Sequence, residues 1–182
     1  MTAQTLLRET LSGDMPPRRL QRRMQHDRGR DMRLRRATVA VSLAGIASMG
    51  IVALYQTGVI RHLPDPPTRW PHFHSDKVNA SEEAFGYGMP DGPITLVAHA
   101  VNLALAAAGP PGRARTRPWL PLLAAAVSAP QAAVAAKYLF HQMPYVDEAW
   151  CPYCVTDALM HFATLGLVAP EALRALESLM RR

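Results

Sequence analysis

The stretch Ala37–Ile60, ATVAVSLAGIASMGIVALYQTGVI, decides the fold of this chain. None of its 24 residues carries a charge, and a helix needs about 20 apolar residues to cross the hydrocarbon core of a bilayer. The apolar core of a signal peptide is shorter, at about 7–15 residues. We therefore interpret this stretch as a retained membrane-spanning helix.

Three more segments of the 182-residue chain are candidates for crossing a membrane. We predict these spans at residues 93–109, 118–141 and 151–168. The last span carries Asp157 and His161, which are costly in lipid and are therefore expected to face neighbouring helices. An amphipathic helix lying at the membrane surface is the alternative for that segment. The predicted fold class is all-α, an integral membrane four-helix bundle.

The N-terminal residues 1–36 have a different character, because they contain ten of the 20 Lys and Arg residues of the chain. Basic tails contact either nucleic acid or anionic surfaces. This one has no aromatic residues interleaved and adjoins an apolar run, so we favour an orientation signal or contact with membrane lipids. No nucleic-acid partner is expected. We predict a mobile, Arg-rich cytoplasmic tail over residues 1–36 and a membrane domain over residues 37–182.

The basic residues also orient the predicted spans. With four crossings, the tail lies on the same side as the short basic segments that contain Arg113, Arg115, Arg117, Arg181 and Arg182. Basic loops stay in the cytoplasm, so both termini are predicted to be cytoplasmic. The protein is thus expected in the cytoplasmic (inner) membrane as a multi-pass protein. Residues 61–92 and the start of the last span face the extracytoplasmic side, where disulfides are permitted.

The only two cysteines lie at that outer end, in the sequence Trp150-Cys151-Pro152-Tyr153-Cys154. This spacing suits redox exchange or half of a zinc site. A zinc site needs further ligands, and a structural disulfide usually closes a longer loop. The histidines at 62, 72 and 74 also suggest a metal, but no acidic or cysteine partner completes that site. We predict a redox pair and no metal.

The residues around the cysteines favour this chemistry. Pro152 suits the first position of a helix, which places Cys151 where amide groups and the helix dipole stabilise a thiolate. The first cysteine of such a pair is usually the exposed one that meets a partner thiol. Asp157 and His161 share one helix face with Cys154 and could relay protons, or they could simply form a packing hydrogen bond.

Three stretches resemble the vitamin K epoxide reductase family over about residues 37–170. They are residues 47–60 with the following 62–67, residues 78–84 with the turn at 88–92, and Cys151-Pro152-Tyr153-Cys154. The resemblance implies a membrane thiol–disulfide oxidoreductase that couples the disulfide to a quinone, either menaquinone or ubiquinone. A thioredoxin-like extracytoplasmic thiol protein is the partner that such a function implies.

The resemblance also implies roles for individual residues. Cys154 would face the quinone, and Cys151 would form the mixed disulfide with the partner. Ser81 matches the loop serine of the family, although by itself it also suits the cap of a short helix beginning at Glu82. His99 shares a face of the second span with Asn102 and could bind a quinone carbonyl, but a tie between two helices is favoured. Ser81, His99, Asp157 and His161 are therefore the candidate quinone-site residues.

The chain departs from the family pattern at two places. Family members usually carry a second cysteine pair in the first outer loop, whereas residues 61–92 contain none, and Asp76 and Asn79 lie where these cysteines are expected. A tyrosine often follows the second cysteine by one helical turn, and Ala158 occupies that position. A catalytically altered or inactive membrane interaction or assembly protein is therefore the alternative function.

Overall fold

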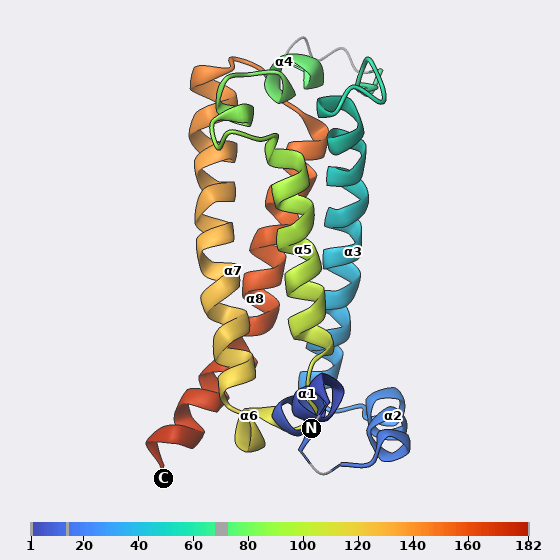
Figure 1. Ribbon diagram of the computed structural model, residues 1–182. Coiled ribbons are helices and arrows are strands. Elements are labelled where there is room, and N and C mark those ends of the chain that lie inside the picture. Colours follow the sequence, from blue (N-terminus) through green and yellow to red (C-terminus); the bar gives the residue numbers. More distant parts are fainter. Residues whose placement is uncertain (1, 14, 68–72, 182) are drawn as a thin grey trace.

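The computed structural model describes residues 2–13, 15–67 and 73–181 (Figure 1). Across these ranges the regular secondary structure is helical, and the β contacts amount to one isolated bridge between Phe73 and Trp150. The all-α prediction is confirmed for this part of the chain.

Four long helices pack side by side (Figure 1). They are α3 (Arg30–Gln56), α5 (Asp91–Ala107), α7 (Trp119–Lys137) and α8 (Pro152–Met180). Helix α7 continues into a π-helical segment, η2 (Tyr138–Val146). Helix α3 packs against α5 and α8, and α8 packs against α7. Small residues such as Gly45, Ser128 and Ala132 on the buried faces allow this close approach.

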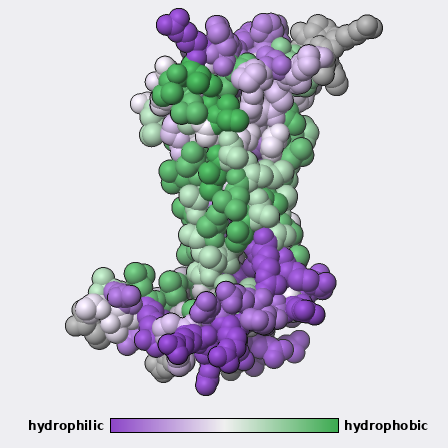
Figure 2. All heavy atoms as spheres, turned by 90° about the vertical axis from the view of Figure 1, so that its right-hand side faces the viewer, coloured by the Kyte–Doolittle hydropathy of each residue, from purple (hydrophilic) through white to green (hydrophobic). Residues whose placement is uncertain are grey.

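Two of the described helices are long and apolar enough to cross a membrane, Arg30–Gln56 and Trp119–Val146. The helix Asp91–Ala107 is also apolar but shorter. Figure 2 shows a face that is hydrophobic along the middle of the long helices and hydrophilic at both ends. This distribution is the one expected of a protein whose middle lies in hydrocarbon.

Helix α3 begins at Arg30, seven residues before the apolar run, and ends at Gln56 rather than at Ile60. Tertiary contacts explain the earlier start, because the buried Arg35 guanidinium donates to the carbonyls of Ala106, Ala108 and Gly109 at 2.7, 2.9 and 2.9 Å. These carbonyls belong to the C-terminal end of α5, where they have no partner within the helix. Arg35 therefore caps a neighbouring helix instead of extending into solvent.

Residues 1–36 also contain two short helices, α1 (Ala3–Ser12) and α2 (Pro17–His26). Both lie at the end of the long helices that also carries α6 (Arg113–Thr116) (Figure 1). Arg36 donates to the Met24 carbonyl at 2.7 Å, and Arg117 donates to the Thr10 carbonyl at 2.7 Å. These contacts attach the Arg-rich segment to the long helices.

The opposite end is covered by α4 (Ser75–Asn79) and by a 3-10 turn, η1 (Glu83–Phe85). Two carboxylates fasten α4. Asp65 accepts from the Ser75 hydroxyl at 2.5 Å, and Asp76 accepts from the Leu63 amide at 2.7 Å and pairs with His62 at 2.8 Å. Burial raises the pKa of Asp76, but the Leu63 amide and the His62 ring outweigh it and hold that pKa below its usual value. Helix α4 is thus held over the start of α8.

Candidate functional site

Cys151 is the N-cap residue of α8, and Pro152 takes the first helical position, as the sequence predicts. The Cys154 amide donates to Cys151 Sγ at 3.3 Å, so this sulfur occupies the place of a capping oxygen. Both cysteines are free thiols. A sulfur that accepts an amide hydrogen bond at a helix N-terminus is stabilised as a thiolate.

Asn79 contacts the cysteine pair, which the sequence does not predict. Its Nδ2 donates to Cys151 Sγ at 3.2 Å, and its Oδ1 accepts from Cys154 Sγ at 3.5 Å, so one buried amide contacts both sulfurs. A further bond from Nδ2 to the Ser75 carbonyl at 2.8 Å holds the amide in α4. In the sequence, Asn79 stands out only because a cysteine is expected near it.

The two cysteines differ in exposure, and the second is the more exposed, whereas the sequence predicts that the first is. Cys151 is completely buried, whereas Cys154 is half-buried. Val78 of α4, together with Met143 and Ala149, belongs to the apolar cluster that encloses Cys151. The expectation that the first cysteine is the exposed one is therefore wrong for this conformation, because the outer segments close over it.

Cys154 instead lines a cavity of about 520 Å³ between α5, α7 and α8. Its walls are mainly apolar, with side chains such as Ile94 and Val134, and a few polar groups converge on it: Asn79, Tyr138, Asp157 and His161. Cavities of roughly 300–1,000 Å³ with this mixture are typical of small-molecule sites.

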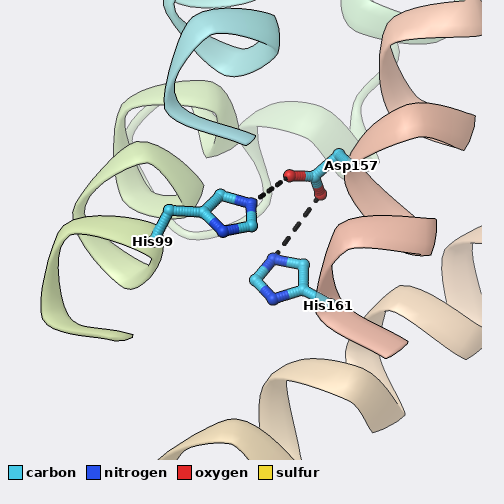
Figure 3. Close-up of side chains that lie close together, drawn as sticks. All are labelled: His99, Asp157 and His161. Carbon is cyan, nitrogen blue, oxygen red and sulfur yellow. Dashed lines mark hydrogen bonds and ion pairs between the residues drawn. The ribbon is translucent and has the colours of Figure 1, made fainter. Parts of the chain in front are cut away.

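Asp157 contacts two histidines, His99 and His161 (Figure 3). His99 Nε2 on α5 is 2.7 Å from Asp157 Oδ1, and His161 Nε2 on α8 is 3.6 Å from Oδ2. The two imidazole rings are stacked, with centroids 4.2 Å apart and planes 14° apart. His99 is completely buried behind the cavity wall, so it ties α5 to α8, whereas Asp157 and His161 reach the cavity.

A glycine makes room for this arrangement. A Cβ atom at Gly45 of α3 would lie 2.3 Å from His99 Nε2 and 2.4 Å from Cε1. Real Cβ contacts are not that short, so the His99 ring occupies space that only glycine leaves open. Three helices, α3, α5 and α8, therefore meet at this histidine.

The ligand atoms of His99, Asp157 and His161 lie within 4.8 Å of one another, close enough to suggest a metal ion. A nitrogen lone pair lies in the plane of its ring, however, and these planes are stacked only 14° apart. One ion cannot lie in both planes unless a ring turns. The geometry therefore disfavours a metal ion shared by the two histidines. Of the other histidines considered for a metal, His62 pairs with Asp76, and His72 lies outside the described residues.

Other candidate residues have structural partners. Ser81 Oγ accepts from the Ala84 amide at 3.4 Å and caps η1, while the cavity is lined by Asn79 and Tyr87 in that region. Asn102 donates to Gln131 at 2.6 Å and so ties α5 to α7. Ser81 is not among the residues that line the cavity, so its position does not support a role in a quinone site. Its hydrogen bond supports the alternative role as a helix cap.

The family model for the vitamin K epoxide reductase family matches residues 36–169, which include the cysteine pair and all but the ends of the long helices. The chain belongs to the vitamin K epoxide reductase family. No curated protein and no solved structure gives a significant match. The family consists of membrane-embedded redox proteins that are associated with quinones. The Arg-rich residues 1–35 lie outside the match.

The cavity of this vitamin K epoxide reductase family member fits a quinone. Its apolar walls suit a flat ring with a hydrocarbon substituent. The Tyr138 hydroxyl itself donates to Asp91 Oδ2 at 2.8 Å, and Gln56 donates to Oδ1 at 2.7 Å. Asp91 thereby fixes the cavity end near the cysteines by joining α3, α5 and η2.

Proposed function

We propose that this protein is a membrane thiol–disulfide oxidoreductase in which Cys151 and Cys154 carry electrons between the thiols of a partner and a quinone. The observation that carries the proposal is the shared cavity. Cys154 lines it together with Asp157 and His161, so a redox sulfur and proton-exchanging groups face the same small-molecule space.

In the proposed membrane arrangement, α3, α5, α7 and α8 are four spans with both chain ends in the cytoplasm and the cysteines on the extracytoplasmic side. The arginines of residues 1–36 and of α6 gather at one end, which supports this orientation. Two acidic groups of helix α8 are paired with neighbouring segments, because Asp157 contacts His99 and Glu171 contacts Arg113. That pairing supports α8 as a span despite its charges.

The proposed reaction begins with thiol–disulfide exchange. A thiolate of the partner attacks Cys151 in the Cys151–Cys154 disulfide and releases Cys154, which forms a mixed disulfide. The second partner thiol then attacks the partner sulfur of this mixed disulfide and releases Cys151, leaving an oxidised partner and two reduced cysteines. The Asn79 amide and the Cys154 N–H then stabilise the Cys151 thiolate. A quinone, when bound, accepts two electrons and two protons. Asp157 and His161 hold protons at the cavity wall, next to Cys154.

The partner must reach a buried sulfur without the help of loop cysteines. Cys151 lies beneath α4, which the Ser75–Asp65 and Asp76–His62 contacts fasten. We propose that a thioredoxin-like protein meets Cys151 when α4 moves aside. Ser75→Ala should therefore raise the alkylation rate of Cys151 relative to the native chain.

The burial of Cys151 and the absence of other cysteines from the sequence favour a second candidate, an interaction or assembly protein that has lost turnover. The redox state of the pair separates the two candidates. In membranes, alkylation gel shifts would be recorded with the quinone pool oxidised and then reduced, with Cys154→Ser as the control for the shifted band. A pair that follows the pool supports the oxidoreductase. A pair that stays in one state refutes it.

A further inference from the structure

Four buried side chains of α3, α5 and α8 carry polar atoms that have no hydrogen-bond partner among the described residues. These atoms are Ser42 Oγ, His99 Nδ1, His161 Nδ1 and Thr164 Oγ1. The exposed fractions of the four residues are 0, 0, 4 and 0%. Leaving a buried polar group unpaired costs about 1–3 kcal/mol. Four such groups in one region therefore call for an explanation beyond packing.

The four residues, which we name the polar column, come from three helices that meet. Gly45 of α3 lies against the His99 ring, and Ser42 is on the same buried face, about one helical turn farther from the cysteines. On α8, Thr164 follows His161 by three residues and shares its buried face. Because α3 packs along both α5 and α8, the polar column leads away from Asp157.

Polar groups continue beyond the polar column toward the Arg-rich end. Thr38 is buried on the same face of α3 as Ser42. Glu171 follows Thr164 by seven residues on α8, about 10 Å along the helix. Its carboxylate is buried and accepts from Arg113 Nε at 3.0 Å and Nη2 at 2.7 Å. Buried polar groups thus recur among apolar ones between the cavity and the end opposite the cysteines.

The chemistry of these groups suits proton transfer. A hydroxyl and a neutral imidazole each donate one hydrogen bond and accept another, so a proton can enter at one atom and leave at the next. Asp157 joins both imidazoles of the polar column to the cavity. We propose that the polar column carries protons to Asp157 from the side of the membrane opposite the cysteines, so that turnover moves charge across the bilayer. This inference rests on the proposed function.

The balance of the reaction shows what is moved. Oxidation of two partner thiols releases two electrons and two protons on the cysteine side. The electrons pass through Cys151 and Cys154 to the quinone, and the two protons that complete the quinol enter through the polar column from the other side. For each quinol formed, the side opposite the cysteines then loses two positive charges and the cysteine side gains two. If the protons came from the cysteine side instead, turnover would move no charge.

The test uses the full chain in sealed phospholipid vesicles that contain menaquinone, with reduced glutathione added outside. Glutathione is charged and stays outside, so only molecules whose cysteines face outward react. We expect a lumen-negative potential, read with a potential-sensitive dye. With valinomycin and potassium present to dissipate the potential, a trapped pH dye should report two protons taken from the lumen per quinol. Quinol formation with no potential and a constant luminal pH would overturn the inference. Absence of quinol formation would refute the proposed function itself.

Matched substitutions at Thr164 test the polar column. Thr164→Val keeps the shape but removes the hydroxyl, and it should slow luminal proton uptake by at least about a hundredfold, the lower end of the range for a lost proton-transfer group. Thr164→Ser keeps the hydroxyl and should restore uptake. Thr164→Val should not lower the thermal unfolding midpoint, because the hydroxyl has no partner among the described residues. Equal uptake by the Val variant and the native chain would contradict the inference.

Discussion

The contact between Gly45 and His99 allows a quantitative test of how the site is assembled. In Gly45→Ala the added Cβ would lie 2.3–2.5 Å from three atoms of a completely buried ring. Overpacking of this kind costs about 1–3 kcal/mol. If the ring moves, its bond to Asp157 is lost, which costs about 1.5–3 kcal/mol for a charged partner. The helix preference of alanine returns about 1 kcal/mol. We expect a net destabilisation of about 1.5–5 kcal/mol.

Gly50 in the same helix is the matched control, because a Cβ there meets no atom within 4 Å. Gly50→Ala should be neutral or stabilising by up to about 1 kcal/mol. The free energy of unfolding would be measured for both variants by titration with sodium dodecyl sulfate in mixed micelles, followed by circular dichroism. Equal effects at the two glycines would refute the reasoning.

A double-mutant cycle identifies the clash as the cause. In a His99→Ala background the ring is absent, so adding Gly45→Ala should not destabilise the protein and should show only the small stabilisation from helix propensity. If Gly45→Ala is as destabilising with alanine at position 99 as with histidine, the contact between helices α3 and α5 at this level is not as described.

Other predictions concern the sulfurs, the Arg-rich end and acid stability. Asn79→Ala removes a hydrogen bond from the Cys151 thiolate, worth about 1.5–3 kcal/mol, and should make the reduction potential of the pair more negative by about 30–60 mV in a glutathione titration; an unchanged potential would exclude this role. Glu171→Gln leaves the buried Arg113 guanidinium without its carboxylate counter-ion and should lower the free energy of unfolding by about 3–5 kcal/mol. The exposed Glu177→Gln should change it by less than about 0.5 kcal/mol. Because the folded pKa of Asp76 is depressed, the stability that its carboxylate contributes is present above the usual carboxyl pKa and is lost as the pH falls through the folded pKa. On acidification the native chain should therefore lose more stability than Asp76→Asn, by less than about 1 kcal/mol for this partly exposed group. Parallel curves of stability against pH for the two proteins would contradict this.

Features that depend on neighbouring residues could be predicted from the sequence. The apolar runs predict the long helices, because helix length and hydrophobicity are properties of one segment. Proline after the first cysteine predicts the start of α8, because both the proline preference and the cap act within one turn. The helical spacing of Asp157 and His161 predicts their shared face, which both use to reach the cavity.

Helix boundaries were harder to predict where distant contacts set them. Arg35 extends α3 toward the N-terminus because it caps α5, and Glu171 lets α8 continue because it pairs with Arg113. In a hydropathy profile these charges mark the end of a span. Once paired within the protein, they no longer oppose the helix.

The sequence by itself determined the helical class, the family and the position of the cysteine pair, because each follows from composition or from residues close together in the chain. Only the tertiary structure decided that Cys151 is buried, that Asn79 contacts it from 72 residues away, and that His99 meets Asp157 opposite Gly45. Such pairings depend on the rotation and register of helices that pack together. These are set by the fit of all the side chains at once, so no single segment encodes them.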